Sequence, residues 1–297
     1  MVFLWELEGS IMKKLVSTTG MSRADWLTWR RRGIGGSDAA ALVGLSPWAT
    51  PFSVYADKLG LLPEQEDNEA MRQGRELEEY VARRFSEASG KNVRRCNAVI
   101  QHPRHDFMLA NVDRLICGER AGLECKTMNP RSPSAPALER GDVPVQYYVQ
   151  CQHYMAVTGL SKWYLAILVL GTAFYWFDVP RHDGDIAALE AAEAAFWKDC
   201  VLAHSAPEPD DTPCCEMVLK QLYPHASEDK EITLATERDA LDRLSQIKRA
   251  QAALEQERRG LENKLRAQMR DAAIGHAGGY TVSLLKRTRS GLDVQAL

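Results

Sequence analysis

The segment Gly122-Leu123-Glu124-Cys125-Lys126-Thr127-Met128 decides the fold, because apolar residues flank two charges in a strand-like stretch. Alternate residues of a strand share a face, so Glu124 and Lys126 should project together while Leu123 and Cys125 point to the other side. Glu-x-Lys also occurs at 228–230 and 262–264, but those copies lie in charged stretches that are expected to be helical. Only the first copy is therefore expected in a sheet.

The residues before this segment predict a hairpin. A strand over 107–116 is joined to it through Cys117-Gly118-Glu119-Arg120, which suits a two-residue turn with glycine at the first central position. Pairing the ends of this turn and continuing the register places Asp113 opposite Glu124, with Cβ atoms roughly 5 Å apart. Two such carboxylates repel unless a cation lies between them, and oxygen ligands of this kind suit Mg²⁺ or Mn²⁺.

Such a pair has two interpretations. A divalent cation held by Asp113 and Glu124, with the Lys126 ammonium beside it, is what phosphodiester hydrolysis requires, because positive charge activates water and stabilises the transition state. The alternative is an ordinary cross-strand ion-pair cluster on a solvated sheet face. Glu78 on an upstream helix is a further carboxylate, although a helical Glu is usually solvated. Gln150 could equally satisfy a buried backbone group.

The surrounding pattern predicts a mixed α/β layer, in which strands are flanked on both sides by helices. Ser22 is the expected N-cap of the first helix. We expect helices near 22–32, 37–43, 51–59, 68–89, 145–157 and 186–202, strands at 93–100, 107–116 and 122–128, and a hairpin of 163–170 with 173–179 around Gly171.

Domain boundaries follow composition. Pro, Asp and Glu dominate 205–213, so we predict a main domain over 21–204 and a linker over 205–227. Residues 228–297 should form a helical arm, with a long amphipathic helix from 228 to about 273, plus a terminal strand. Residues 1–20 carry no clear pattern, and Met12 is an alternative start, so this segment is interpreted as mis-started or disordered.

Composition excludes several classes of protein. The 297 residues carry 37 Lys and Arg against 40 Asp and Glu, so any basic surface for nucleic acid must be local. Seven cysteines without a Cys-x-x-Cys pair argue against a structural zinc site or a disulfide framework. The sequence has no apolar run of roughly 18 residues and no signal-peptide pattern, so a cytoplasmic protein without a membrane segment is expected.

A second candidate site is the run Arg30-Arg31-Arg32-Gly33-Ile34-Gly35-Gly36-Ser37-Asp38. Its glycines let the backbone approach a ligand, and Ser37 is expected to cap the following helix, whose free N–H groups attract an anion. Arg30 or Arg31 would then clamp a phosphate. The alternative is merely a capped helix after a glycine loop.

These pieces occur in an order that resembles the YqaJ-type viral recombinases, the phage lambda-type exonucleases within the PD-(D/E)xK nuclease superfamily. The resemblance covers roughly Asp25 to Cys200. It rests on the run 29–38, Gly74-x-x-Leu77-Glu78, Asn111-Val112-Asp113, Leu123-Glu124-Cys125-Lys126-Thr127 and Gln150-x-Gln152-x-Tyr154-Met155-x-Val157-Thr158-Gly159.

The resemblance implies a PD-(D/E)xK core and a role for each matched residue. Mg²⁺, for which Mn²⁺ may substitute, would be bound by Asp113, Glu124, the backbone carbonyl of Cys125 and an outer carboxylate from Glu78. Lys126 would be the catalytic lysine, and Gln150 would help to position the nucleophilic water. Arg30 and Ser37 would bind the 5′-terminal phosphate, with Arg31, Arg114 and Arg131 as further candidate DNA contacts.

The implied activity is digestion of one strand of double-stranded DNA from its 5′ end in phage or prophage recombination, leaving a 3′ single strand for an annealing protein. A homo-oligomer, a trimer in the best-known members, is also implied. Val112 and Arg114 replace the proline and glycine that often flank the aspartate, so substrate preference stays open. The alternatives are a structure-specific or nicking endonuclease of the same fold, and a non-catalytic DNA-binding adaptor. The arm would serve oligomerisation, bind the annealing partner, or contact DNA through Lys286, Arg287 and Arg289.

Overall fold

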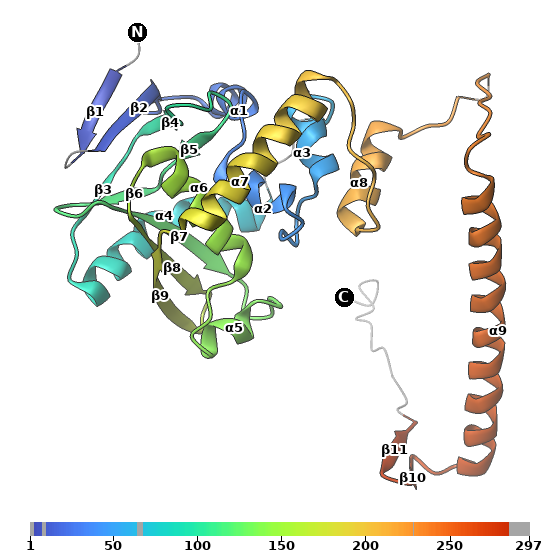
Figure 1. Cartoon of the computed structure of the whole chain (residues 1–297). Helices are drawn as coiled ribbons and strands as arrows, with labels where there is room; N and C mark the ends of the chain where they lie inside the picture. Colours follow the sequence, from blue (N-terminus) through green and yellow to red (C-terminus); the bar gives the residue numbers. More distant parts are fainter. Residues whose placement is uncertain (1–2, 8–9, 64–67, 228, 285–297) are drawn as a thin grey trace, which may run out of the picture. The chain divides into compact units, whose positions relative to one another are not determined.

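The computed structural model describes residues 3–7, 10–63, 68–227 and 229–284 (Figure 1). The chain divides into two units, 1–225 and 226–297. The basic tail residues Lys286, Arg287 and Arg289 lie outside the described residues. Among those described, no helix is long and apolar enough to cross a membrane.

A five-stranded mixed sheet forms the centre of the first unit, in the order β3-β6-β7-β8-β9. Strand β7 pairs in parallel with β8, whereas the other neighbours are antiparallel. The strands are β3 (Val93–Arg95), β6 (Arg114–Ile116), β7 (Ala121–Met128), β8 (Lys162–Val169) and β9 (Ala173–Pro180). The hairpin of β8 and β9 is confirmed as predicted.

The predicted register of β6 and β7 is also observed. Arg114 pairs with Leu123 and Leu115 with Gly122, and one further step in this register brings Asp113 opposite Glu124. Gly118, with φ of +79°, occupies the turn where a left-handed conformation favours glycine.

Two expected strands are each broken in the structure. The stretch 93–100 divides into β3 and β4 (Ala98–Gln101), with Asn97 between them at φ of +48°. The stretch 107–116 divides into β5 (Leu109–Asn111) and β6. In each case the second sheet, in the order β1-β2-β4-β5, takes one half and the five-stranded sheet takes the other. Asp113 therefore lies where the chain passes from one sheet to the other.

Residues left unassigned from sequence contribute to this second sheet. Strand β2 (Ser10–Ser17) pairs antiparallel with β4 and with β1 (Phe3–Leu7), and Met12 is 1% exposed. The structure thus departs from the interpretation of 1–20 as disordered, because 10–17 form a strand paired on both sides, whereas a mis-started chain stays a prediction. Local sequence could not signal a partner more than 80 residues away.

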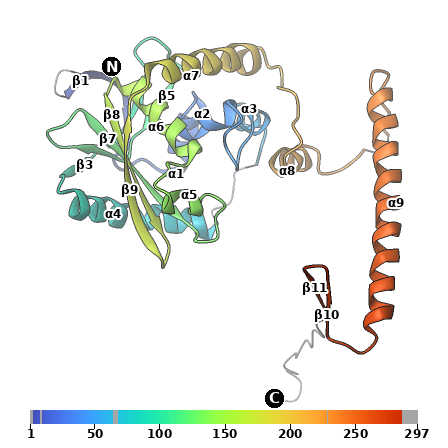
Figure 2. The ribbon, with the colours of Figure 1, turned by 60° about the horizontal axis from the view of Figure 1, so that its bottom comes forward.

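Helices cover both faces of the five-stranded sheet (Figure 2). On one face, α4 (Glu69–Ser89) packs Val81, Ala82 and Phe85 against Leu123 and Tyr164. On the other, α6 (Val145–Thr158) packs Cys151, Met155 and other apolar residues against Leu165 and Ile167. This layering buries Leu123 towards α4 and turns Glu124 towards α6, as the strand alternation predicts.

Several of the remaining helices of the first unit pack on α6 or on one another. Ser22 caps the first of them by accepting from the Asp25 backbone N–H, as predicted. The helices are α1 (Arg23–Arg31), α2 (Gly36–Leu42), α3 (Pro51–Lys58), α5 (Ala135–Glu139), α7 (Asp183–Phe196) continued by a π-helical turn at Trp197–Leu202, and α8 (Pro213–Leu222). The mixed α/β fold predicted from sequence is confirmed.

Two local expectations were wrong. The N-cap of α2 is Gly35 and not Ser37, because the Asp38 carboxylate turns back to accept from the Gly35 backbone N–H at 3.0 Å. The stretch 205–227, interpreted as a linker, contains α8, whose Cys215 and Val218 are buried against Phe52 of α3. Pro213 opens α8 at its first position, where proline is favoured, so its presence does not mark a linker.

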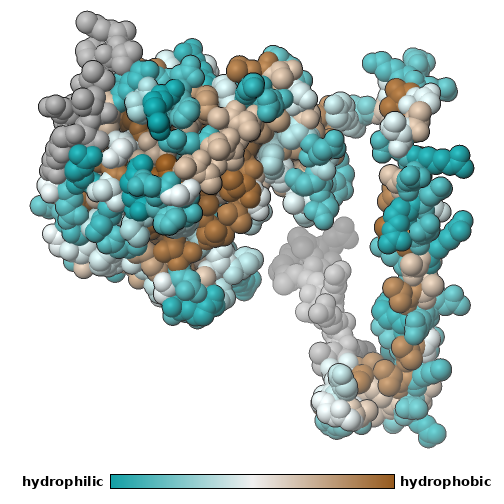
Figure 3. Space-filling model, in the orientation of Figure 1, coloured by the Kyte–Doolittle hydropathy of each residue, from teal (hydrophilic) through white to brown (hydrophobic). Residues whose placement is uncertain are grey.

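The second unit contains one long helix and a hairpin. Helix α9 (Arg238–Met269) begins later than predicted, and β10 (Ile274–Ala277) pairs with β11 (Tyr280–Ser283). Apolar side chains lie exposed along α9 among charged ones (Figure 3). They include Leu241, Leu244, Leu254, Leu261 and Leu265, each more than 40% exposed.

Candidate active site

The structure brings Glu124 and Lys126 of β7 together with Gln150 of α6. Glu124 is 3% exposed, and its Oε1 accepts from Lys126 Nζ at 2.5 Å and from Gln150 Nε2 at 2.7 Å. Its second oxygen, Oε2, is buried and has no hydrogen-bond partner among the described residues. A buried carboxylate oxygen without a partner is energetically costly, so this atom is suited to a ligand from outside the chain.

Asp113 completes a group that we name the carboxylate cluster: Asp113, Glu124, Lys126 and Gln150. Its Oδ2 accepts from the Cys125 backbone N–H at 2.8 Å, which holds the side chain beside β7. Burial raises the pKa of Asp113 well above its usual value, and the charges of Glu124 and Glu78 raise it further. Excess negative charge at this point is the electrostatic condition that a bound cation relieves.

Lys126 supplies the positive charge of the cluster. Burial lowers the pKa of Lys126, but Glu124 and then Asp113 raise it more, so the net pKa lies above its usual value and the side chain is an ammonium. Its Nζ lies 5.3 Å from the centre of the Tyr147 ring. Gln150 Nε2 also donates to the hydroxyl of Tyr154 at 2.8 Å, which fixes the amide against Glu124.

Glu78 lies near the carboxylate cluster but has its own partner. Arg114, whose side chain is 3% exposed, contacts Glu78 Oε1 at 2.5 Å and Glu79 Oε2 at 3.0 Å. The same guanidinium donates to the Asp113 carbonyl oxygen at 2.7 Å. Arg114 therefore ties α4 to the start of β6 and occupies the carboxylate that the resemblance assigns to the metal.

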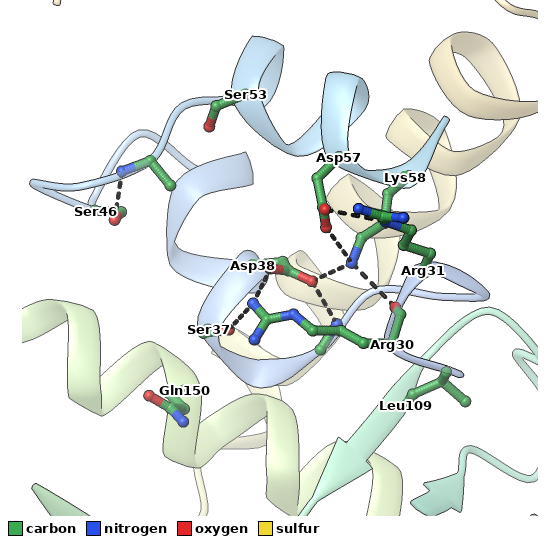
Figure 4. Close-up of polar contacts among 12 residues, drawn as sticks. Arg30, Arg31, Ser37, Asp38, Ser46, Ser53, Asp57, Lys58, Leu109 and Gln150 are labelled. Carbon is green, nitrogen blue, oxygen red and sulfur yellow. Dashed lines mark hydrogen bonds and ion pairs between the residues drawn. The ribbon is translucent and has the colours of Figure 1, made fainter. Parts of the chain in front are cut away.

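The arginine run forms a second group, which we name the Arg30 cluster: Arg30, Ser37, Asp38 and Lys58 (Figure 4). Arg30 Nη2 donates to Ser37 Oγ at 2.8 Å and to Asp38 Oδ1 at 3.0 Å. Asp38 Oδ2 accepts from Lys58 Nζ at 2.6 Å. The arginine side chain remains 32% exposed, whereas those of Asp38 and Lys58 are 8% and 0% exposed.

The two clusters approach each other where Gly36 of α2 packs on Gln150 of α6. A Cβ placed on Gly36 would lie 2.9 Å from Gln150 Cγ and 2.7 Å from Tyr154 Cε1, so only glycine allows α2 to approach α6 this closely. Ser37 directly follows Gly36, and Gln150 contacts Glu124. A short path through packed atoms thus joins Ser37 to the buried carboxylates.

The other candidates lie outside both clusters. Arg31 pairs with Asp57 at 3.4 Å, and Arg131 is exposed in the turn after β7. Gln152 is fully buried and bonds to the Pro180 carbonyl and the His182 N–H, so it satisfies two backbone groups.

A cleft of about 470 Å³ opens beside Asp113. Its lining is mostly basic and polar, with one aromatic side chain, and it includes Arg23, Trp26, Arg75, Arg95, Asn111 and Arg114. Because the whole chain carries a net negative charge, a basic surface for nucleic acid must be local. The arginines of this cleft provide such a surface.

The carboxylate cluster fits a hard divalent cation. Asp113 and Glu124 provide oxygen donors, and the partnerless Glu124 Oε2 is available for coordination. Among the described residues no group of three or more His, Cys, Asp or Glu side chains could hold a metal, so side-chain ligands would come from the two carboxylates.

Comparisons with known proteins agree with this arrangement. Residues 25–161 match the model of the YqaJ-like viral recombinase domain. The chain is 41% identical over 287 residues to the uncharacterized protein YqaJ of Bacillus subtilis (strain 168), covering 95% of this chain and 89% of that protein. The chain belongs to the YqaJ-like viral recombinase family.

The fold of this YqaJ-like chain also matches solved structures. An alkaline exonuclease from Laribacter hongkongensis, LHK-Exo, superposes with a TM-score of 0.51 at 22% identity, covering 61% of this chain and 94% of that one. The structure of LHK-Exo in complex with dAMP gives a TM-score of 0.52 at 21% identity. The YqaJ-like chain thus has the PD-(D/E)xK fold of the phage-type exonucleases, as the sequence resemblance implied.

Sequence reasoning missed several residues of the YqaJ-like site. Lys58 lies in the predicted helix 51–59 without a predicted role, and Asp38 has none beyond its motif. Tyr147 and Tyr154, which contact Lys126 and Gln150, were not predicted as part of the site. An apolar surrounding of Val54, Tyr55 and Ala56 was the one local signal that Lys58 lies in a buried part of α3.

Proposed function

We propose that this protein is a divalent-metal-dependent DNA nuclease that removes nucleotides from the 5′ end of one strand of a duplex. The observation that carries the proposal is the buried Glu124, paired on one oxygen with Lys126 and Gln150 and partnerless on the other. Family membership and the exonuclease fold support nuclease chemistry.

The cation, Mg²⁺ or Mn²⁺, would be held by Asp113 and Glu124, with the backbone carbonyl of Cys125 as a further ligand. When bound there it supplies Lewis acidity towards the scissile phosphate and the attacking water. Glu78 would contribute as an outer carboxylate only after its contact with Arg114 is exchanged.

The chain's own residues supply charge and orientation. Lys126 would place its ammonium against the negative charge that develops on the phosphoryl oxygens in the transition state. Gln150, fixed by Tyr154 and Glu124, would orient the attacking water through its amide. Because Glu124 and Gln150 are buried, these contacts act where bulk water screens charge weakly.

The direction of digestion would follow from the Arg30 cluster. A strand whose 5′-phosphate contacts Arg30 and Ser37 would extend past Gly36 and Gln150 to the carboxylates, so cleavage would release nucleotides from that end. Arg31, Arg114 and Arg131 would add contacts to the DNA backbone. The annealing partner, the ring-shaped trimer and a role in phage recombination stay predictions from the resemblance.

The decisive experiment incubates the purified protein with 5′-phosphorylated linear duplex and with closed circular duplex, in Mg²⁺ or in EDTA. Stepwise loss of the 5′ strand of the linear substrate only, abolished by EDTA and by Glu124→Ala, is the expected result. Cutting of the circle would favour an endonuclease instead. Absence of cleavage on both substrates would leave a DNA-binding adaptor.

A further inference from the structure

Lys58 is a buried cation with no place in the reaction described so far. It ends α3, and its side chain is 0% exposed although lysine is rarely buried without a partner. Its Nζ donates to Asp38 Oδ2 at 2.6 Å and to the Arg30 carbonyl oxygen at 3.2 Å. Asp57 Oδ2 lies 3.9 Å away.

The Arg30 cluster is layered from the interior outward. Lys58 lies deepest, Asp38 lies between the two cations, and Arg30 lies at the exposed side next to Ser37 (Figure 4). Burial raises the pKa of Asp38, but Lys58 and then Arg30 lower it more, so the carboxyl stays charged. The charges of Arg30, Lys58 and Asp38 give the cluster a formal charge of +1.

Loss of the Lys58 charge would change how Asp38 is neutralised. A buried carboxylate needs a cation, so Asp38 would then be neutralised by Arg30 alone. The formal charge of the cluster would fall to zero, so Arg30 would present no net positive charge to a phosphate. With Lys58 in place, Arg30 can keep its bond to Asp38 and still present an uncompensated positive charge.

We propose that Lys58 is a specificity-determining positioning residue, which neutralises Asp38 from the interior and thereby leaves the charge of Arg30 available for a 5′-terminal phosphate. The inference rests on the proposed function, because it concerns the same end of the DNA strand. It deepens that function by assigning selectivity for the phosphorylated end to a residue that does not touch the DNA.

The test measures kcat/KM on two duplexes that differ only in a 5′-phosphate or a 5′-hydroxyl on the digested strand. The readout is the ratio between the two substrates. For Lys58→Met we expect this ratio to fall about tenfold, mainly through KM on the phosphorylated end, because attraction to the phosphate is weakened. Lys220→Met, which removes an exposed lysine paired with Glu216, is the matched control and should keep the wild-type ratio.

Rescue separates charge balance from a packing role. Asp38→Asn combined with Lys58→Met returns the cluster to +1, so the ratio should recover to within a few-fold of wild type. If the double variant is as poorly selective as Lys58→Met, the inference is overturned. Restored charge must restore the ratio, whereas two independent structural defects would add and not cancel.

Arg30→Ala distinguishes failure of the inference from failure of the proposed function. Loss of the ratio in Arg30→Ala but not in Lys58→Met would overturn only the role of Lys58. An unchanged ratio in Arg30→Ala would overturn both, because the phosphate pocket would be elsewhere. Should Lys58→Met fail to fold, Asp38→Asn alone still decides: a charge of +2 must keep or raise the ratio, and a fall to the Arg30→Ala value would overturn the inference.

Discussion

The carboxylate cluster and the Arg30 cluster are neighbours with opposite charge balance. Asp113, Glu124 and Lys126 sum to a formal charge of −1 and leave one buried oxygen without a partner. Arg30, Asp38 and Lys58 sum to +1, and both oxygens of Asp38 accept from a cation within the chain. The first cluster is incomplete without a cation, whereas the second is complete and attracts an anion.

This difference suggests how one nucleic-acid strand could satisfy both clusters. A phosphodiester chain brings its own anions, and a divalent cation can accompany the phosphate at the carboxylates. A polyanion lying across Gln150 would therefore meet positive charge at its end and a cation site further along. Substitutions that change one cluster without the other separate chemistry from end recognition.

The largest effect is expected from Glu124→Gln, which removes the charge for the cation and weakens the contact of Lys126. We expect the single-turnover cleavage rate to fall at least about 10³-fold. Duplex binding, measured by fluorescence anisotropy in EDTA, should be retained or tighter, because a buried negative charge is lost. Glu119→Gln, on the turn between β6 and β7 and paired with Lys91, is the control and should stay within a few-fold of wild type. A rate loss below tenfold for Glu124→Gln would remove this residue from the reaction centre.

Lys126→Met should have the next largest effect, because it removes the positive charge beside Glu124 and keeps the aliphatic stem. The expected loss is on the order of 10²–10³ in cleavage rate with DNA binding largely intact. Lys162→Met on the adjacent strand β8, where the lysine is exposed and pairs with Asp178, is the matched control. Binding that collapses together with the rate would contradict a role confined to the transition state.

Arg30→Ala should have a smaller and selective effect. A charge-assisted hydrogen bond is worth about 1.5–3 kcal/mol, so kcat/KM on a 5′-phosphorylated end should fall roughly 10–100-fold. Activity on a 5′-hydroxyl end should fall much less. Arg31→Ala, which frees Asp57, should affect both ends alike. Equal losses on both ends for Arg30→Ala would make Arg30 a general phosphate contact.

The two clusters also differ in how far sequence could predict them. Asp113 and Glu124 follow from strand alternation and a two-residue turn, because both are local rules that survive folding. The Arg30 cluster depends on α3 returning Lys58 to Arg30 near the end of α1, 28 residues earlier, which no local period encodes. The same limit explains β2, whose partner β4 is remote in sequence, and the contact of Arg114 with Glu78 on α4, which spans 36 residues.

The smallest expected effect concerns a third buried pair, His153 and Glu193. His153 Nδ1 lies 2.8 Å from Glu193 Oε1 and its Nε2 lies 2.9 Å from the Leu109 carbonyl oxygen, so both nitrogens face acceptors and the ring is protonated. Burial lowers the pKa of His153, but Glu193 raises it more, and the net shift is upward.

A raised folded-state pKa means that the native protein binds more protons than the unfolded chain above about pH 6.5. The stabilisation is therefore complete below that pH and is lost as pH rises through the folded pKa. We expect the Tm of wild type, relative to a His153→Gln, Glu193→Gln double variant, to decline by a few degrees between pH 6 and 9. Differential scanning fluorimetry across this range measures it. A difference that stays flat or grows with pH would mean that the imidazole is neutral and that one of its two contacts is not a hydrogen bond.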